Sequence, residues 1–306
     1  MQQHLIPDAD GVLHPAGFLQ QTNEDYHAGP GYSKSDLDLV ARSLRHYWAA
    51  KRAPNRVPRV RTDAMLLGSA VHCAILEPDL FAAEYVRVPE DAPGRPTARQ
   101  INAKKPSPET MDAIAFWRDF EAANQGKELL TAEQWATALA MRDAVHADQI
   151  ARRVLTGGRA EQSVHAIDRQ TGLHIKCRLD YLQDGAGLIG DLKTTSDAGP
   201  EEFGRSSAVY RYHVQCGYYR RVMREAFGEA PEFWAFVAVE KDPPYAIGVY
   251  YVDEDVASLG ARMAERDLLK LASALESDRF PAYTPDAVAK LVLPGWYVKR
   301  AEESLL

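Results

Sequence analysis

The feature that most constrains the fold of this chain is an alternation of polar and apolar residues. In "LHIKCRLDYL" (173–182) the two kinds alternate from His174 to Tyr181. A period of two is typical of a β-strand that turns one face toward a core. "GAG" at 185–187 predicts a turn, and "LIGDLKTT" (188–195) predicts the partner strand. The sequence therefore predicts a β-hairpin over 173–195.

The polar face of this hairpin carries two acids and a lysine. Side chains two positions apart on a strand point the same way, so Asp191 and Lys193 share a face, and Asp180 lies on the polar face of the preceding strand. If the two faces match, the carboxylates meet, and a hard divalent cation such as Mg²⁺ would offset their repulsion. The lysine could then orient or deprotonate water and offset charge on a phosphate. Alternatively, these residues simply face water and form salt bridges across the hairpin.

The rest of the chain predicts helices packed against a sheet. One further hairpin is expected from "FWAFVAVEK" (233–241) and "YAIGVYYVD" (245–253), and a polar, proline-bearing loop from 89 to 108. The expected fold is α/β, with a central mixed sheet flanked by helices. Apolar residues at helical spacing predict helices over 31–50, 64–77, 108–124, 131–147, 206–228 and 253–277.

No linker clearly divides the chain. Residues 1–30, rich in glycine and proline, are expected to be an irregular lead-in, and 31–306 a single domain. Its parts would be a helical region (31–155), a core with the hairpin (about 156–252) and a C-terminal helix and tail (253–306). With 306 residues, 46% of them hydrophobic, the chain can build a substantial core.

Composition limits the classes of partner. No run approaches the roughly 20 apolar residues of a membrane helix, and the N-terminus has no signal-peptide pattern, so we expect a cytoplasmic protein without membrane contact. The three cysteines form no CxxC pair. The formal charge of -7 argues against coating DNA through overall charge, so DNA contacts would be local. "KRAPNRVPRVR" is either a phosphate-contacting stretch or a solvated linker; its arginines are Arg52, Arg56, Arg59 and Arg61.

Two further motifs flank the hairpin in a fixed order. G-x-x-x-H (Gly68 to His72) lies upstream on a predicted helix, and Q-x-x-x-Y (Gln215 to Tyr219) lies downstream on another. Alone, His72 on an apolar helix is typical of a core histidine, and a tyrosine-rich helix is typical of packing. In this order, with Asp180 eleven residues before the D-x-K acid, the four weak signals support one another.

The series "GSAVH", "CRLDYL", "GDLKTT" and "YHVQCGYY" resembles the PD-(D/E)xK nuclease superfamily, in its RecB-like branch, and is most similar to the RecE or exodeoxyribonuclease VIII type of phage recombination exonucleases. The opening "YSKSDLDLVARSLRHYW" and "LPGWY" near the end add to the likeness, which covers roughly residues 30 to 297. The resemblance implies a restriction-endonuclease-like core and makes 31–306 a nuclease domain.

The resemblance also implies roles for particular residues. Asp180 and Asp191 would bind Mg²⁺, for which Mn²⁺ could substitute, and Lys193 would be the catalytic lysine. The acid of the D-x-K motif is aspartate here, where many members of the superfamily carry glutamate. The remaining implied residues are His72 and the Leu192 carbonyl as further metal ligands, Gln215 and Tyr219 as residues that bind the DNA strand or brace the site, and Glu161 as an acid for a second metal.

The activity implied by the resemblance is a 5′-to-3′ exonuclease on double-stranded DNA ends. It would leave 3′ single strands for an annealing protein and act as a ring-shaped homo-oligomer around DNA. An endonuclease or a 3′-to-5′ enzyme of repair or defence is the alternative that keeps the chemistry. A DNA-binding or assembly module with a vestigial site is an alternative of another class. A metal hydrolase of a small substrate is disfavoured by the arginine-rich segment at 51–61.

Overall fold

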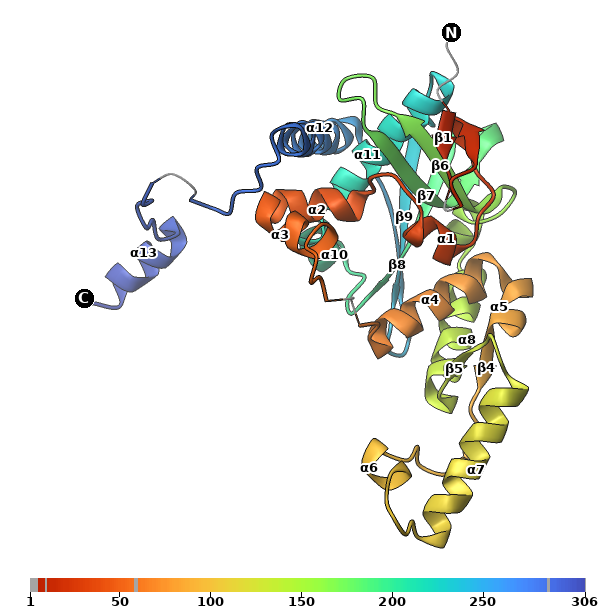
Figure 1. Ribbon diagram of the computed structural model, residues 1–306. Coiled ribbons are helices and arrows are strands. Elements are labelled where there is room, and N and C mark those ends of the chain that lie inside the picture. The colour runs from red at the N-terminus through yellow and green to blue at the C-terminus, as the bar shows by residue number, and fades with distance from the viewer. Residues whose placement is uncertain (1–4, 9, 58–59, 285–286, 306) are drawn as a thin grey trace. The chain divides into compact units, whose positions relative to one another are not determined.

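The computed structural model describes residues 5–8, 10–57, 60–284 and 287–305 (Figure 1). Contacts divide the chain into two compact units: Met1–Lys34 with Pro58–Glu265, and Ser35–Val57 with Arg266–Leu306. The boundaries of the predicted lead-in and nuclease domain cut across this division, so the single domain over 31–306 stays a prediction. Within the described residues, no helix has the length and apolar character needed to cross a membrane.

The first unit is built on a six-stranded sheet with the order β10-β9-β8-β7-β6-β3, as Figure 1 shows for most of its strands. The pair β8 and β9 is parallel and the other neighbours are antiparallel, which confirms the mixed α/β sheet. The strands are β3 (Gly17–Phe18), β6 (Arg159–Ile167), β7 (His174–Gln183), β8 (Leu188–Thr195), β9 (Phe233–Glu240) and β10 (Ile247–Tyr251).

Both predicted hairpins are confirmed. β7 and β8 are joined by a short 3₁₀ turn at Asp184–Ala186, and Gly187 then adopts a left-handed conformation with φ of 59°, which glycine adopts without steric cost. β9 and β10 pair between residues 235–239 and 247–251, within the two predicted strand segments. The strand patterns therefore located two hairpins of the sheet correctly.

The long predicted helices are also present, but two of them are broken. The stretch 31–50 forms α2 (Lys34–Arg42) and α3 (Leu44–Lys51), because the side chain of Ser43 accepts a hydrogen bond from the His46 amide and caps a new helix. The stretch 206–228 is divided between α10 (Pro200–Val209) and α11 (Tyr212–Phe227) at Arg211, whose φ is 59°. The unbroken helices are α4 (Asp63–Leu76), α7 (Pro108–Ala123), α8 (Ala132–Ala147) and α12 (Glu254–Ser277).

The described part of segment 1–30 is not irregular, so that prediction was wrong. β1 (Leu5–Pro7) and β2 (Leu13–Pro15) form a small hairpin, β3 joins the edge of the main sheet, and α1 (Asn23–Ala28) follows. The physical reason is a contact between this segment and a residue that is distant in the sequence. The buried ammonium of Lys176 donates hydrogen bonds to the carbonyls of Tyr26 at 2.5 Å and Gly29 at 2.7 Å. Local glycine and proline content carries no sign of such a contact.

Smaller elements lie between and beyond the predicted helices and strands. A two-stranded parallel sheet joins β4 (Tyr85–Arg87) to β5 (Glu128–Leu130), and α6 (Ala98–Ile101) interrupts the predicted loop 89–108. The other short helices are α5 (Pro78–Glu84), α9 (Gln149–Val154) and α13 (Gly295–Glu303), the last within the predicted tail.

One cluster of the core of the first unit packs α4 and α8 against one face of the sheet. Leu192 of β8 and Val237 of β9 pack with Val71 of α4 and Met141 of α8, all four fully buried. Because side chains alternate along a strand, Asp191 points to the other face, where α11 lies. In the second unit, Asp36 and Lys51 form an ion pair at 2.9 Å.

Candidate active site

Three acids from neighbouring strands lie in one row across the sheet. The pairing of β6 with β7 continues on both sides of Glu161 and Asp180, and the pairing of β7 with β8 ends at the residues next to Asp180 and Asp191. The carboxylate of Asp180 is close enough to repel those of both Glu161 and Asp191. The hairpin predicted from the sequence therefore does bring its acids together, and a third strand adds another.

Lys193 lies beside the end of this row. Its ammonium forms an ion pair with Asp191, whose side chain is only 1% exposed, and lies 5.0 Å from the centre of the Tyr212 ring. Burial alone would lower the pKa of Lys193, but the neighbouring carboxylates of Asp191 and Asp180 outweigh it and hold that pKa above its ordinary value. The lysine is therefore a fixed cation at the acids.

Hydrogen bonds fix the orientation of Asp191 and Asp180. The side-chain amide of Gln215, on α11, donates a hydrogen bond to Asp191 Oδ2 at 2.5 Å. The backbone amide of Leu192 donates to Asp180 Oδ2 at 2.8 Å. Gln215 is thus at the site, as the Q-x-x-x-Y motif predicted, and it holds Asp191 from the opposite side to Lys193.

His72 of α4 completes a possible ligand set with Glu161 and Asp180. One ligand atom from each of the three residues lies within 4.8 Å of the others, and His72 Nδ1 is 3.7 Å from Asp180 Oδ2. The backbone of Leu192 also hydrogen bonds with His72. Burial, and then the charge of Lys193, lower the pKa of His72 to about 4, so its imidazole is neutral and has a nitrogen lone pair to donate.

The acids themselves are electrostatically suited to a cation. Burial, followed by repulsion from Asp180, raises the pKa of Glu161 to about 8. Burial also raises the pKa of Asp191 to about 6, and that of Asp180 rises for the same first reason. A divalent cation stabilises the charged form of neighbouring buried carboxylates, because it offsets their mutual repulsion. Such a cation accepts oxygen and nitrogen ligands. This donor set can therefore hold a divalent metal.

Sequence analysis missed Arg178, which holds Glu161 in place. Its Nε donates to Glu161 Oε2 at 2.6 Å, and its Nη1 donates to Ser163 Oγ at 2.8 Å and to the Gln21 carbonyl at 3.1 Å. Glu161 has a φ of 52°, a left-handed conformation that is rare for a residue with a side chain. One signal in the sequence could have identified Arg178 as a site residue. It lies two residues before Asp180, so the two side chains share a face of the strand.

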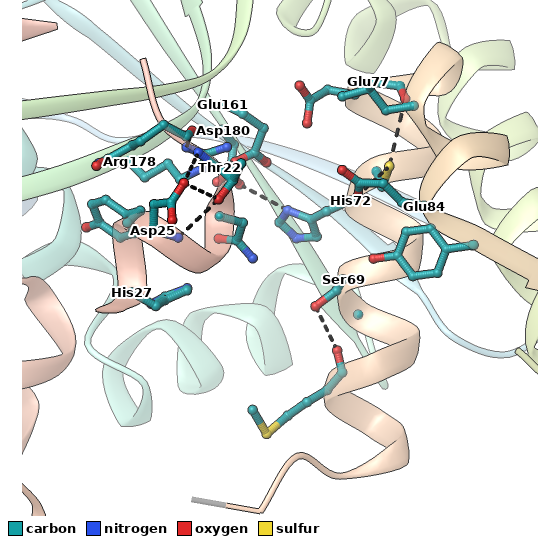
Figure 2. A pocket seen from close by; sticks show the side chains of 18 of the residues that line it. Thr22, Asp25, His27, Ser69, His72, Glu77, Glu84, Glu161, Arg178 and Asp180 are labelled. Carbon is teal, nitrogen blue, oxygen red and sulfur yellow. Dashed lines mark hydrogen bonds and ion pairs between the residues drawn. The ribbon is translucent and has the colours of Figure 1, made fainter. Parts of the chain in front are cut away.

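A pocket of about 840 Å³ opens onto two acids of the row, Glu161 and Asp180 (Figure 2). One wall is the segment 20–27, including α1, and another is α4; Figure 2 shows His72 pointing toward Asp180 and Glu161 between these walls. The segment 20–27 was not predicted to be near the site. Further acids of the pocket that sequence reasoning missed are Asp25, Glu77 and Glu84.

Tyr219 also lines the pocket, one helical turn beyond Gln215 on α11. Its ring meets that of Trp234 edge-on, with the ring centres 5.8 Å apart. Burial raises the pKa of Tyr219 well above its ordinary value, so its hydroxyl stays protonated. It can donate a hydrogen bond into the pocket, but it is not positioned to act as a base.

The described arginines of the segment 51–61 are divided between the two units. Arg61 belongs to the first unit and forms an ion pair with Glu128, and it is not among the residues that line the pocket. Arg52 and Arg56 belong to the second unit, where Arg52 lies 4.0 Å from Asp278. Arg59 falls outside the described residues. DNA binding by this segment stays a prediction.

The raised pKa of Glu161 predicts a pH-dependent stability in the absence of metal. A carboxyl that binds its proton more tightly in the folded protein contributes stability at low pH, which is lost as the pH rises from about 4.5 to about 8. In EDTA, Glu161→Gln should therefore match the wild type in thermal midpoint near pH 4.5 and exceed it increasingly up to pH 8. A midpoint difference that does not change with pH would contradict this expectation.

A mixed sheet that carries acids on adjacent strands, with a lysine two residues beyond the last acid, defines a PD-(D/E)xK type of core. Residues 33–288 match the model of a family described as a PDDEXK-like domain of unknown function (DUF3799). The chain therefore belongs to this family of PDDEXK-like domains. Family and site together support a nuclease. A comparison with curated proteins gave no match.

One solved structure agrees with this chain at the level of the fold. A "putative exonuclease" from Eubacterium rectale is 14% identical, with a TM-score of 0.57 over 92% of this chain and 98% of that chain. A phage related exonuclease from Haemophilus somnus 129PT is 11% identical, with a TM-score of 0.32 over 65% of this chain and 99% of that one. At these identities the first likeness shows a shared fold alone, and the second carries no weight.

Proposed function

We propose that this protein is a Mg²⁺-dependent exonuclease that degrades double-stranded DNA ends in the 5′-to-3′ direction. The observation that carries the proposal is the cluster of Glu161, Asp180 and Asp191 with the ammonium of Lys193, in which Glu161 and Asp180 line the pocket. A lone hairpin with salt bridges would not need a neutral histidine and a third acid beside it. The same intact set argues against a vestigial site.

The acid row would hold the cation. Asp180 and Asp191 are the central candidates, with Glu161, His72 and the Leu192 carbonyl around them. When bound, Mg²⁺ or Mn²⁺ supplies positive charge that polarises the phosphodiester and offsets the charge that develops during its hydrolysis. The preference for Mg²⁺ is part of the proposal.

The residues of the chain have distinct tasks in this reaction. Lys193, charged and held by Asp191, donates hydrogen bonds to a phosphoryl oxygen or orients the attacking water. Gln215 keeps Asp191 in position through its amide. Tyr219 donates a hydrogen bond from its protonated hydroxyl to substrate at the pocket wall. Because the chain carries a net charge of -7, a phosphate would reach this acidic pocket through the cation.

The direction and biological task rest on the resemblance of the motifs to the RecE type. We propose that the products are 3′ single strands for recombination through an annealing protein. A ring-shaped homo-oligomer would enclose the duplex and turn basic residues inward, which would reconcile DNA binding with the acidic total charge. The hydrolysis itself needs neither the annealing protein nor the ring.

A linear duplex with different labels on its 5′ and 3′ ends tests the proposed direction. With Mg²⁺, the 5′ label should be released first while the 3′ label stays on long strands. A covalently closed circle of the same sequence should survive, because it offers no end. Cutting of the circle would indicate an endonuclease instead. Release of the 3′ label first would indicate the opposite polarity.

A further inference from the structure

Gly68 is a glycine inside a helix that the protein's own packing does not require. It lies in the middle of α4, where glycine is less favourable than alanine. Outside the backbone of its own helix, no heavy atom of the described residues lies within 4 Å of the place where a Cβ would be. Its φ is not in the left-handed region. Neither close packing nor backbone conformation therefore explains this glycine.

At two other helical glycines, close packing does exclude a side chain. A Cβ on Gly217 of α11 would come within 2.2 Å of the Ala261 amide nitrogen. A Cβ on Gly260 of α12 would come within 1.9 Å of the His213 carbonyl oxygen. These glycines let two helix backbones touch. At Gly68 no packed neighbour among the described residues fills the corresponding space.

The empty space over Gly68 belongs to the pocket at the acid row. Gly68 lines the pocket together with Met65 and Ser69, and His72 follows one turn later on the same face of α4. Four residues of helix advance about 6 Å, which is within the span of one nucleotide. The wall from Met65 to Ser69 carries no charge, unlike the acids farther round the pocket.

We propose that Gly68 is the point of closest approach for the sugar–phosphate backbone of the DNA strand that is cut. With the scissile phosphate at the acid row, the adjoining deoxyribose would pass against the bare backbone of α4. Its neutral sugar suits the uncharged wall, and a side chain at position 68 would push the strand away from Lys193. This inference rests on the proposed nuclease function and adds a substrate contact to it.

The test is a graded series at position 68 with a matched control. Gly68→Ala and Gly68→Leu should keep or slightly raise the thermal midpoint, by roughly 2 °C, because both residues favour helix. Their kcat/KM on linear duplex should fall by about tenfold to a hundredfold, more for leucine, because a displacement of about 1 Å from the reacting geometry is costly. Mn²⁺ affinity, measured by titration calorimetry, should not change.

Gly204→Ala is the control, because Gly204 lies in α10, is exposed, and also has no neighbour within 4 Å of a Cβ among the described residues. It should change the thermal midpoint in the same way and leave cleavage intact. Wild-type rates for Gly68→Leu would overturn the assignment, as would a lowered midpoint or weakened Mn²⁺ binding in both Gly68 variants. If the wild type itself does not cleave, the proposed function fails, and the assignment fails with it.

Discussion

Replacing Lys193 by alanine should lower the rate of Mg²⁺-dependent cleavage of a linear duplex by at least about a hundredfold, the scale of a lost proton-transfer or charge-stabilising group. Lys193 is the basic residue of β8, and an ion pair with Asp191 holds its ammonium at the acid row. Duplex binding should survive, because it depends on contacts spread over a larger surface. The measurement is the initial rate of nucleotide release at saturating Mg²⁺.

The control for this variant is Lys241→Ala. Lys241 is an exposed lysine just after β9, outside the pocket, so its removal takes away the same charge without touching the site. Thermal unfolding of both variants with Mg²⁺ present would show that each is folded. If Lys193→Ala is folded and cleaves at the wild-type rate, Lys193 is not the catalytic lysine.

Asp180→Asn should change stability and function in opposite directions. Asp180 lies between Glu161 and Asp191 in the row, so removing its charge should relieve repulsion and raise the thermal midpoint of the metal-free protein. The amide oxygen of asparagine can still accept the hydrogen bond from the Leu192 amide. Metal affinity should fall by about a hundredfold or more, since even loss of a ligand's supporting partner costs tenfold to a hundredfold. Cleavage should fall with it.

Calorimetric titration with Mn²⁺ and thermal unfolding in EDTA measure the two effects of this variant. Asp242→Asn, an exposed acid in the turn between β9 and β10, is the matched control and should change neither. A variant that is less stable in EDTA, or that binds Mn²⁺ as tightly as the wild type, would show that Asp180 has a structural role rather than a role as a ligand.

The central part of the site could be predicted from the sequence because it depends on local order. Strand periodicity fixes which side chains share a face, and a short turn fixes the register of a hairpin, so Asp180, Asp191 and Lys193 were found together. Gln215 could be found only through a motif, since nothing in its own helix indicates that it reaches Asp191.

The walls of the site could not be predicted, because they depend on contacts between distant segments. The segment 20–27 reaches the pocket through hydrogen bonds to Arg178 and Lys176 of β7, about 150 residues away, and local sequence suggested only an irregular lead-in. Glu161 lay in a weak local context, and its unusual backbone conformation becomes visible only in the folded sheet. The helix breaks at Ser43 and Arg211 were hidden by continuous apolar periodicity.

Digestion of a linear duplex by the wild-type protein, with Mg²⁺ in one arm and EDTA in the other, tests the central claim most directly. Steady release of nucleotides with Mg²⁺ and none in EDTA is the predicted result. Folded protein that leaves the duplex intact with Mg²⁺ and with Mn²⁺, or that degrades it equally well in EDTA, would contradict the assignment of the acid row as a metal-dependent nuclease centre.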